Sequence, residues 1–201
     1  MTVSRWDALE HPWHAAFGEA AHAYLKLGSP PIGAVVVDAS GEIIARGAND
    51  FPRDRLAHAE VTALSQIPAA MNRLKCEIYS TLEPCAMCAG AIRMCQLHAV
   101  HFAAADPSAG SSSLFGANEF MREFPCSVHG PDHPELELVV VALVVESRAR
   151  NGHHRWREHW SQYHPSGVAL GTRLATSGAY RDWVGQSLSP RELYERVALA
   201  A

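Results

Sequence analysis

Three residues of the kind that bind metal ions occur in two short motifs, and they constrain the fold more than any other feature. The first motif reads HAE, residues 58–60, and the second reads PCAMC, residues 84–88. Cysteine thiolates and histidine nitrogens are preferred ligands of zinc. Because Cys85 and Cys88 are three residues apart, both sulfurs can face one point at the start of a helix. His58, on a preceding helix, can supply a third ligand, so the fold must bring the two motifs together.

Three protein ligands leave the fourth position of a tetrahedral zinc ion open, which is typical of a catalytic site. Zinc lowers the pKa of a water in that position from about 15.7 toward ~7. Glu60 lies two residues after His58 and need not bind the metal, so it can move protons to and from a substrate. The alternatives are a redox pair or half of a four-ligand structural site for the two cysteines, and a solvated helix carboxylate for Glu60.

Hydrophobic patterns predict strands and helices that alternate along the chain. We expect helices over 6–27, 57–67, 85–95, 114–123 and 153–164, and another that begins at Ser189. We expect strands over 32–37, 42–46, 76–81, 97–104 and 136–145, the first two forming a hairpin, and a loop-like segment over 165–188. The run LELVVVALVV at 136–145 is typical of a strand covered on both faces. This order indicates an α/β fold with helices on both sides of a mixed sheet.

The distribution of charge bears on the kind of substrate. Residues 1–147 hold nine Lys/Arg and 17 Asp/Glu, a net charge of −8, whereas residues 148–201 hold eight and four, a net charge of +4. An acidic main body repels a phosphate backbone. The charges therefore disfavour a large nucleic-acid substrate without excluding one.

Cysteine count and hydropathy predict the compartment. The chain has five cysteines, and its N-terminal residues lack the apolar core of a signal peptide. An odd number of cysteines without a secretion signal argues against a disulfide framework, and we expect a cytoplasmic protein. No apolar run approaches the roughly 18 residues of a membrane-spanning helix, so no membrane contact is expected.

The two motifs together, H-x-E followed by P-C-x-x-C, resemble the signature of zinc-dependent nucleobase deaminases. Over residues 10–147 the sequence resembles the cytidine deaminase-like superfamily, and IGAVVV at 32–37 is similar to the first core strand of that family. The segments HAEVTAL (58–64) and STLEPCAMCAGAI (80–92) are most similar to the branch that contains guanine deaminases and tRNA adenosine deaminases.

The resemblance implies a three-layer α/β/α domain around a five-stranded mixed sheet over residues 1–147. Residues 148–201 would then be a helical extension that covers the active site or takes part in a dimer. By the same resemblance, His58, Cys85 and Cys88 hold one Zn²⁺ per chain, and Glu60 is the proton shuttle. A homodimer is also expected from the resemblance.

The implied reaction is hydrolytic replacement of an exocyclic amino group by a carbonyl, with release of ammonia. The expected substrate is a small heterocycle (guanine, a cytosine-like ring, an aminopyrimidine or a triazine) or its nucleoside. A tRNA-specific adenosine deaminase is the main alternative, although the loop DPSAGSSS at 106–113 lacks the basic residues that such enzymes usually place there. An inactive, zinc-stabilised interaction module is a third possibility.

Residues on the substrate side are predicted with alternatives. Asn49 resembles a substrate-binding asparagine of the family, but it also fits an ordinary turn. The backbone at Gly33 and Ala34 either faces the substrate ring or packs within a strand. Glu83 either has a polar role beside the site or stabilises a helix N-terminus.

Aromatic residues of the segment HHRWREHWSQYH at 153–164 are candidates for a lid over the site. Trp156, Trp160 and Tyr163 offer flat faces on which a heterocycle can stack. A dimer contact or a packing helix is the alternative for this segment.

Overall fold

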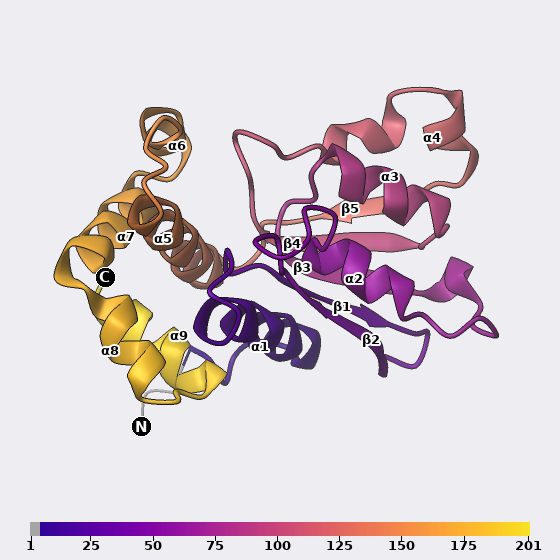
Figure 1. The fold of residues 1–201 in the computed structure, drawn as a ribbon. Coiled ribbons are helices and arrows are strands. Elements are labelled where there is room, and N and C mark those ends of the chain that lie inside the picture. The colour runs from indigo at the N-terminus through magenta and orange to yellow at the C-terminus, as the bar shows by residue number, and fades with distance from the viewer. Residues whose placement is uncertain (1–4) are drawn as a thin grey trace.

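A five-stranded mixed sheet lies at the centre of the structure, a computed structural model that describes residues 5–201 (Figure 1). Strand β1 pairs antiparallel with β2 and with β3, while β3, β4 and β5 run parallel, in the order β2-β1-β3-β4-β5. The strands are β1 (Gly33–Val37), β2 (Ile43–Ala48), β3 (Glu77–Leu82), β4 (Ala99–Ala104) and β5 (Ser127–His129). The predicted hairpin and mixed sheet are confirmed.

Helices cover both faces of the sheet and make three layers (Figure 1). The alternation along β1 shows the division, because Val35 packs against α1, while its neighbours Ala34 and Val36 belong to the core under α2 and α3. Helix α5 lies on the same side as α1 and contacts β4 and β3. These helices are α1 (His11–Leu25), α2 (Ala59–Ser65), α3 (Ala86–Met94) and α5 (Pro134–Arg150).

The strand predicted at 136–145 is wrong, because these residues lie in helix α5. All residues from Val139 to Val145 are at most 1% exposed, so an apolar run without helical periodicity here marks a helix buried on all sides. It is enclosed by β4, by α7 (Pro165–Ser177) and by α9 (Pro190–Leu199). Pro134 at its start and Arg148 and Arg150 in its last turn are typical helix-end residues. The fifth strand is β5 instead.

The loop predicted at 165–188 is also wrong, because the segment forms α7 and α8 (Ala179–Gly185). Gly167 and Gly171, which have low helical propensity, are both buried where α7 crosses α5. A Cβ at Gly171 would lie 2.4 Å from the carbonyl oxygen of Ala142, so only glycine permits this approach. Gly178, with φ of 75°, ends α7 in the left-handed conformation.

Several predicted helix boundaries shift in the structure. The helix expected at 114–123 divides into η2 (Ser112–Gly116) and α4 (Glu119–Glu123), and Asn118 caps the latter. The helix expected at 153–164 is the shorter α6 (Arg157–Tyr163). A further short element, η1 (Arg73–Lys75), precedes β3. The helix start at Ser189 is confirmed, since Ser189 and Glu192 form a complete capping box.

The C-terminal helices and the sheet layer share one hydrophobic cluster. It runs from Trp13 and Phe17 of α1 through α5 to Trp183 and Leu193. The division predicted at residue 147 falls inside α5 and stays a prediction. Within residues 5–201, no helix combines the length and the apolar character that crossing a membrane requires.

Candidate metal centre and adjoining cavity

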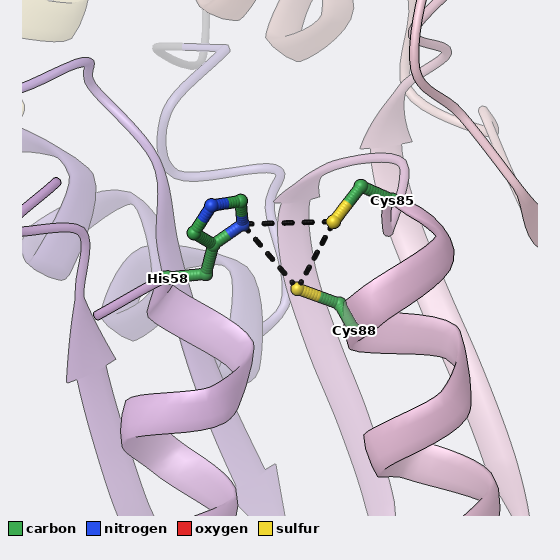
Figure 2. Close-up of side chains that lie close together, drawn as sticks. All are labelled: His58, Cys85 and Cys88. Carbon is green, nitrogen blue, oxygen red and sulfur yellow. Dashed lines mark hydrogen bonds between the residues drawn. The ribbon is translucent and has the colours of Figure 1, made fainter. Parts of the chain in front are cut away.

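His58, Cys85 and Cys88 converge at the N-terminal ends of two neighbouring helices (Figure 2). His58 is the N-cap residue of α2, and Cys85 is the N-cap residue of α3. Cys88 lies in the first turn of α3 and is fully buried. The β3–α3 connection is short, so the end of a central strand places both sulfurs beside the imidazole.

The distances between the three donor atoms fit a tetrahedral metal ion. The sulfurs of Cys85 and Cys88 are 3.6 Å apart, and they lie 3.6 Å and 3.5 Å from Nδ1 of His58. Zinc–sulfur bonds of about 2.3 Å and zinc–nitrogen bonds of about 2.05 Å at tetrahedral angles give separations of about 3.8 Å and about 3.6 Å. Two thiolates and one imidazole are also the chemical set that zinc prefers. The residues present could therefore hold this ion.

The two sulfurs have opposite tendencies to ionise. Hydrogen bonds with Cys88 and His58 lower the pKa of Cys85 to about 3, and the same contact with Cys85 raises the pKa of Cys88. The hydrogen bond to Cys85 also raises the pKa of His58. The pair of sulfurs thus keeps one proton between them, and a divalent cation favours its loss.

Glu60 lies directly beside this cluster. Its side chain is 3% exposed, and burial raises the pKa of the carboxyl group. Oε2 accepts a hydrogen bond from the Cys88 thiol at 3.4 Å, and Oε1 accepts one from the hydroxyl of Ser80 on β3 at 3.3 Å. A carboxyl group held in this way can exchange protons with a molecule at the metal position.

A cavity of about 700 Å³ adjoins the cluster. One part of its lining comes from His58, from Asn49 and from the α1–β1 loop, and another part comes from the C-terminal end of α5 and the segment after it. The described lining residues are Gly28, Pro30, Ile32, Asn49, Phe51, Pro52, His58, Val144, Ser147, Arg148, Asn151, His153 and Trp156.

Comparison with known proteins agrees with this geometry. The model of the cytidine and deoxycytidylate deaminase zinc-binding region matches residues 8–104. The tRNA-specific adenosine deaminase of Bacillus subtilis is 42% identical over 102 residues, which are 48% of this chain and 62% of that protein. A solved tRNA:A34 deaminase structure is 34% identical with a TM-score of 0.53, and the match covers 60% of this chain and 97% of that one. The chain belongs to the cytidine deaminase-like superfamily.

A second solved structure of this fold holds a purine. The protein NE0047 in complex with 2,6-diaminopurine is 25% identical with a TM-score of 0.53, and the match covers 72% of this chain and 85% of that one. The chain spans less than two thirds of the length of the Bacillus subtilis relative and of two other curated relatives. Membership of the superfamily accounts for the sheet and for a zinc-binding region, which contains all three donor residues.

Asn49 is a predicted substrate residue that lines the cavity together with His58. It follows β2 and is 2% exposed. Its Nδ2 donates to Oγ of Ser29 at 2.9 Å and approaches the carbonyl oxygen of Pro30 at 3.4 Å. The side-chain amide is therefore held in a fixed orientation, and its oxygen can accept a hydrogen bond from a ligand in this deaminase-family pocket.

Three predicted substrate residues have packing roles in this member of the superfamily. Gly33 and Ala34 are buried in β1, and a Cβ at Gly33 would lie 2.2 Å from the Ala16 carbonyl oxygen of α1. Glu83 accepts hydrogen bonds from the backbone of Asp106 and from the backbone and hydroxyl of Ser112. Glu83 thereby anchors the loop after β4, and none of the three lines the cavity.

The aromatic residues of the C-terminal segment separate into three positions. Trp156 lines the cavity, as a lid residue would. Trp160 is fully buried, and its indole N–H donates to the hydroxyl of Ser108 at 2.8 Å. Tyr163 is 62% exposed and does not line this cavity. Only one of the three therefore reaches the site.

Three polar lining residues were not singled out from the sequence: Ser147, Arg148 and Asn151. They come from the end of α5 and the turn that follows it. The basic character of residues 148–201 is a signal for Arg148 alone. Because 136–145 was interpreted as a strand, its downstream residues had no predicted position relative to the metal centre.

Proposed function

We propose that the chain is a zinc-dependent aminohydrolase that replaces an exocyclic amino group of a nucleobase-like heterocycle with oxygen. The observation that carries this proposal is the tetrahedral spacing of His58, Cys85 and Cys88 with the buried carboxyl group of Glu60 in contact. A redox pair needs neither the histidine nor the carboxylate. A four-ligand structural zinc site needs a further protein ligand, and the described residues offer three.

Each residue of the cluster has a distinct role in this proposal. His58, Cys85 and Cys88 hold the zinc, which when bound lowers the pKa of a coordinated water toward about 7. Glu60 accepts a proton from the attacking water and donates it to the ring nitrogen beside the reacting carbon. It then carries the second proton to the leaving amine, so one water and one amino compound give a carbonyl compound and ammonia.

The surroundings of Glu60 suit repeated proton transfer. Burial raises the pKa of the carboxyl group, which makes its ionised form a stronger base toward the attacking water, and the hydrogen bond from Ser80 fixes its orientation. Asn49, whose amide nitrogen is engaged by Ser29, is assigned to hold the heterocycle through its oxygen. Asn49 thus orients the substrate in the cavity, and Ser80 orients the carboxyl group of Glu60 beside the metal donors.

We infer that the substrate is a small molecule, because Trp156 and His153 of the C-terminal segment form one wall of the cavity. This segment lies outside residues 8–104, to which the family match is confined. The loop 106–113 contains neither lysine nor arginine for phosphate contacts. A homodimer is a further expectation from the resemblance, and a cytoplasmic location stays an expectation from the sequence.

A tRNA-specific adenosine deaminase is the second candidate function. It is favoured by the Bacillus subtilis relative, which bears that name, and by the solved tRNA:A34 deaminase structure. The two candidates share the metal centre and Glu60, and they differ in whether the cavity accepts an isolated heterocycle or a nucleotide within an RNA loop.

The test is ammonia release from a panel of free bases, nucleosides, aminotriazines and a tRNA anticodon stem-loop. Glu60→Ala serves as the control, since it removes the proposed proton carrier. Turnover of a base or nucleoside supports the small-molecule function, and turnover of the stem-loop alone supports the second candidate. If zinc-loaded protein releases no ammonia from any of these compounds, the proposed function is wrong.

A further inference from the structure

The part of the cavity lining that comes from the end of α5 carries a fixed positive charge, that of Arg148. Of the described residues that line the cavity, none is Asp or Glu, and one, Arg148, is cationic at any ordinary pH. His58 and His153 are the other titratable lining residues. The lining thus carries one fixed positive charge and no carboxylate, in a chain whose net charge is −4.

Arg148 differs from the other partly buried arginines in its hydrogen bonds. Arg93 donates to the carbonyl oxygen of Phe120 and to the carboxylate of Glu123, and Arg150 donates to Glu146. Arg148 donates no hydrogen bond to any residue in the range 5–201 that is described, and Asp106 is its one acidic neighbour, at 3.7 Å. A guanidinium has five N–H donors, so those of Arg148 remain available to a ligand.

Neighbouring rings hold Arg148 in place without using those donors. Its guanidinium lies 5.1 Å from the ring centre of Trp156 and 4.7 Å from that of Trp160. Burial lowers the pKa of Arg148 from its ordinary value, with Asp106 opposing. Ser147, the preceding residue, is 1% exposed, and its hydroxyl has no hydrogen-bond partner among the described residues. A fixed fork of donors beside an unpartnered hydroxyl is suited to an anion.

The size of the cavity allows more than a single heterocycle. Pockets of about 300–1,000 Å³ hold whole drug-sized ligands, and this cavity of about 700 Å³ lies within that range. The metal cluster and Asn49 occupy one side, where the amino group and the ring would bind. Arg148 lines the same cavity from the end of α5, a different element from those that carry His58 and Asn49.

We propose that Arg148 binds a phosphate group of the substrate, which makes the substrate a phosphorylated nucleoside rather than a free base. This inference rests on the proposed deaminase function of the same site. Arginine binds phosphate through two parallel N–H···O bonds, a geometry that lysine cannot reproduce. The phosphate belongs either to a free nucleotide or to an RNA strand, and the same experiment distinguishes these sources.

The test compares kcat/KM for ammonia release from adenosine, guanosine and cytidine with that from their 5′-monophosphates and from an RNA stem-loop. The proteins are the zinc-loaded wild type, Arg148→Gln, Arg148→Lys and the matched control Arg181→Gln, which alters an exposed arginine of α8 outside the cavity. Calorimetric titration with inorganic phosphate and with the monophosphates gives a second readout that does not depend on turnover.

In the wild type, we expect phosphate to raise kcat/KM for the reactive nucleoside by roughly 10- to 100-fold, the range for a charged hydrogen bond. Arg148→Gln should bring the ratio of kcat/KM for monophosphate and nucleoside down to about 1, Arg148→Lys should restore part of the gain, and Arg181→Gln should behave as wild type. A gain restricted to the stem-loop would place the phosphate in RNA.

Two results would overturn the proposal: equal kcat/KM for nucleoside and monophosphate in the wild type, or equal losses for both in Arg148→Gln. If no compound releases ammonia, the proposed function fails, and the titrations still decide the role of Arg148. Absence of phosphate or monophosphate binding at millimolar concentration would then refute it. If Arg148→Gln melts far below the wild type, Arg148→Lys, which keeps the charge and the stem, replaces it.

Discussion

Helix α1 rests directly on strand β1 at Gly33, so Gly33→Ala is expected to destabilise the protein strongly. The added Cβ would lie 2.2 Å from the Ala16 carbonyl oxygen and 2.2 Å from the Ala20 amide nitrogen. An ordinary contact begins at 3.4 Å, so helix and strand must separate by about 1.2 Å. Both obstructing atoms belong to the backbone, and no side-chain rotation can relieve the clash.

The loss in the free energy of unfolding can be worked out from the packing around this contact. Overpacking a core costs about 1–3 kcal/mol, and a clash with backbone lies at the upper end of that range. For a chain of this size, 1 kcal/mol shifts Tm by about 2–4 °C, so a loss of about 3 kcal/mol lowers Tm by about 6–12 °C. Thermal unfolding followed by circular dichroism measures this shift.

The control for this variant is Gly185→Ala, because a Cβ at Gly185 meets no atom within 4 Å. That variant should melt within about 2 °C of the wild type, since alanine adds no clash. If Gly33→Ala melted with the wild type, the close approach of α1 to β1 would be refuted. An unchanged Tm with a raised KM would place the Gly33 backbone against the substrate, as the resemblance first implied.

Two other predictions concern a histidine on the sheet and a helix cap. Burial lowers the pKa of His101 below its ordinary value. Glu77 and Asp132 act to raise this pKa, and His129 acts to lower it. A depressed pKa in the folded state means that stability falls as pH drops from about 6.5 through the folded-state pKa. NMR titration of the ring checks this, and a midpoint above 6.5 would reverse the sign. Ser189→Ala removes the hydroxyl that caps α9 and should cost about 1 kcal/mol, or about 2–4 °C of Tm; an unchanged Tm would mean that the capping box does not stabilise α9.

The sequence was sufficient to predict the parts of the fold that have a clear local signal. Residues 32–37 and 42–46 are short apolar runs on either side of a turn at Gly41, and α2 and α3 begin at the two metal-binding motifs, so the hairpin and both helices were predicted correctly. Helix α5 was missed because full burial removes the polar face that reveals a helix. Pro134 at its start was the overlooked signal.

The error at α7 has a different cause. Gly167 and Gly171 lower the helical propensity of the segment, and from the sequence alone they indicate a loop. Their Cβ positions are occupied by Val141 and by Ala142 and Val145 of α5. The two glycines are therefore explained by the close contact between α7 and α5. Because α5 was predicted as a strand, the helix that explains them was missing from the prediction.

The candidate site also has one part that the sequence predicts and another part that it does not. The metal donors and Glu60 are set by short motifs, and the sequence was enough to select them. The distal wall depends on the path of the chain after Arg150, which turns so that Trp156 faces the cavity and Tyr163 faces solvent. The two residues are seven positions apart in the sequence. No local sequence pattern distinguishes the residue that lines the cavity from the one that faces solvent.

The most direct test of the central claim is the turnover of Glu60→Gln at measured zinc content. The amide keeps the shape of the side chain and loses the ability to carry protons. We predict about one zinc per chain in both wild type and variant, and a loss in kcat of roughly 10²- to 10⁴-fold, the contribution typical of general acid–base catalysis. A variant with full zinc and wild-type turnover would contradict the assignment of Glu60, and a variant without zinc would make Glu60 a ligand instead of a proton carrier.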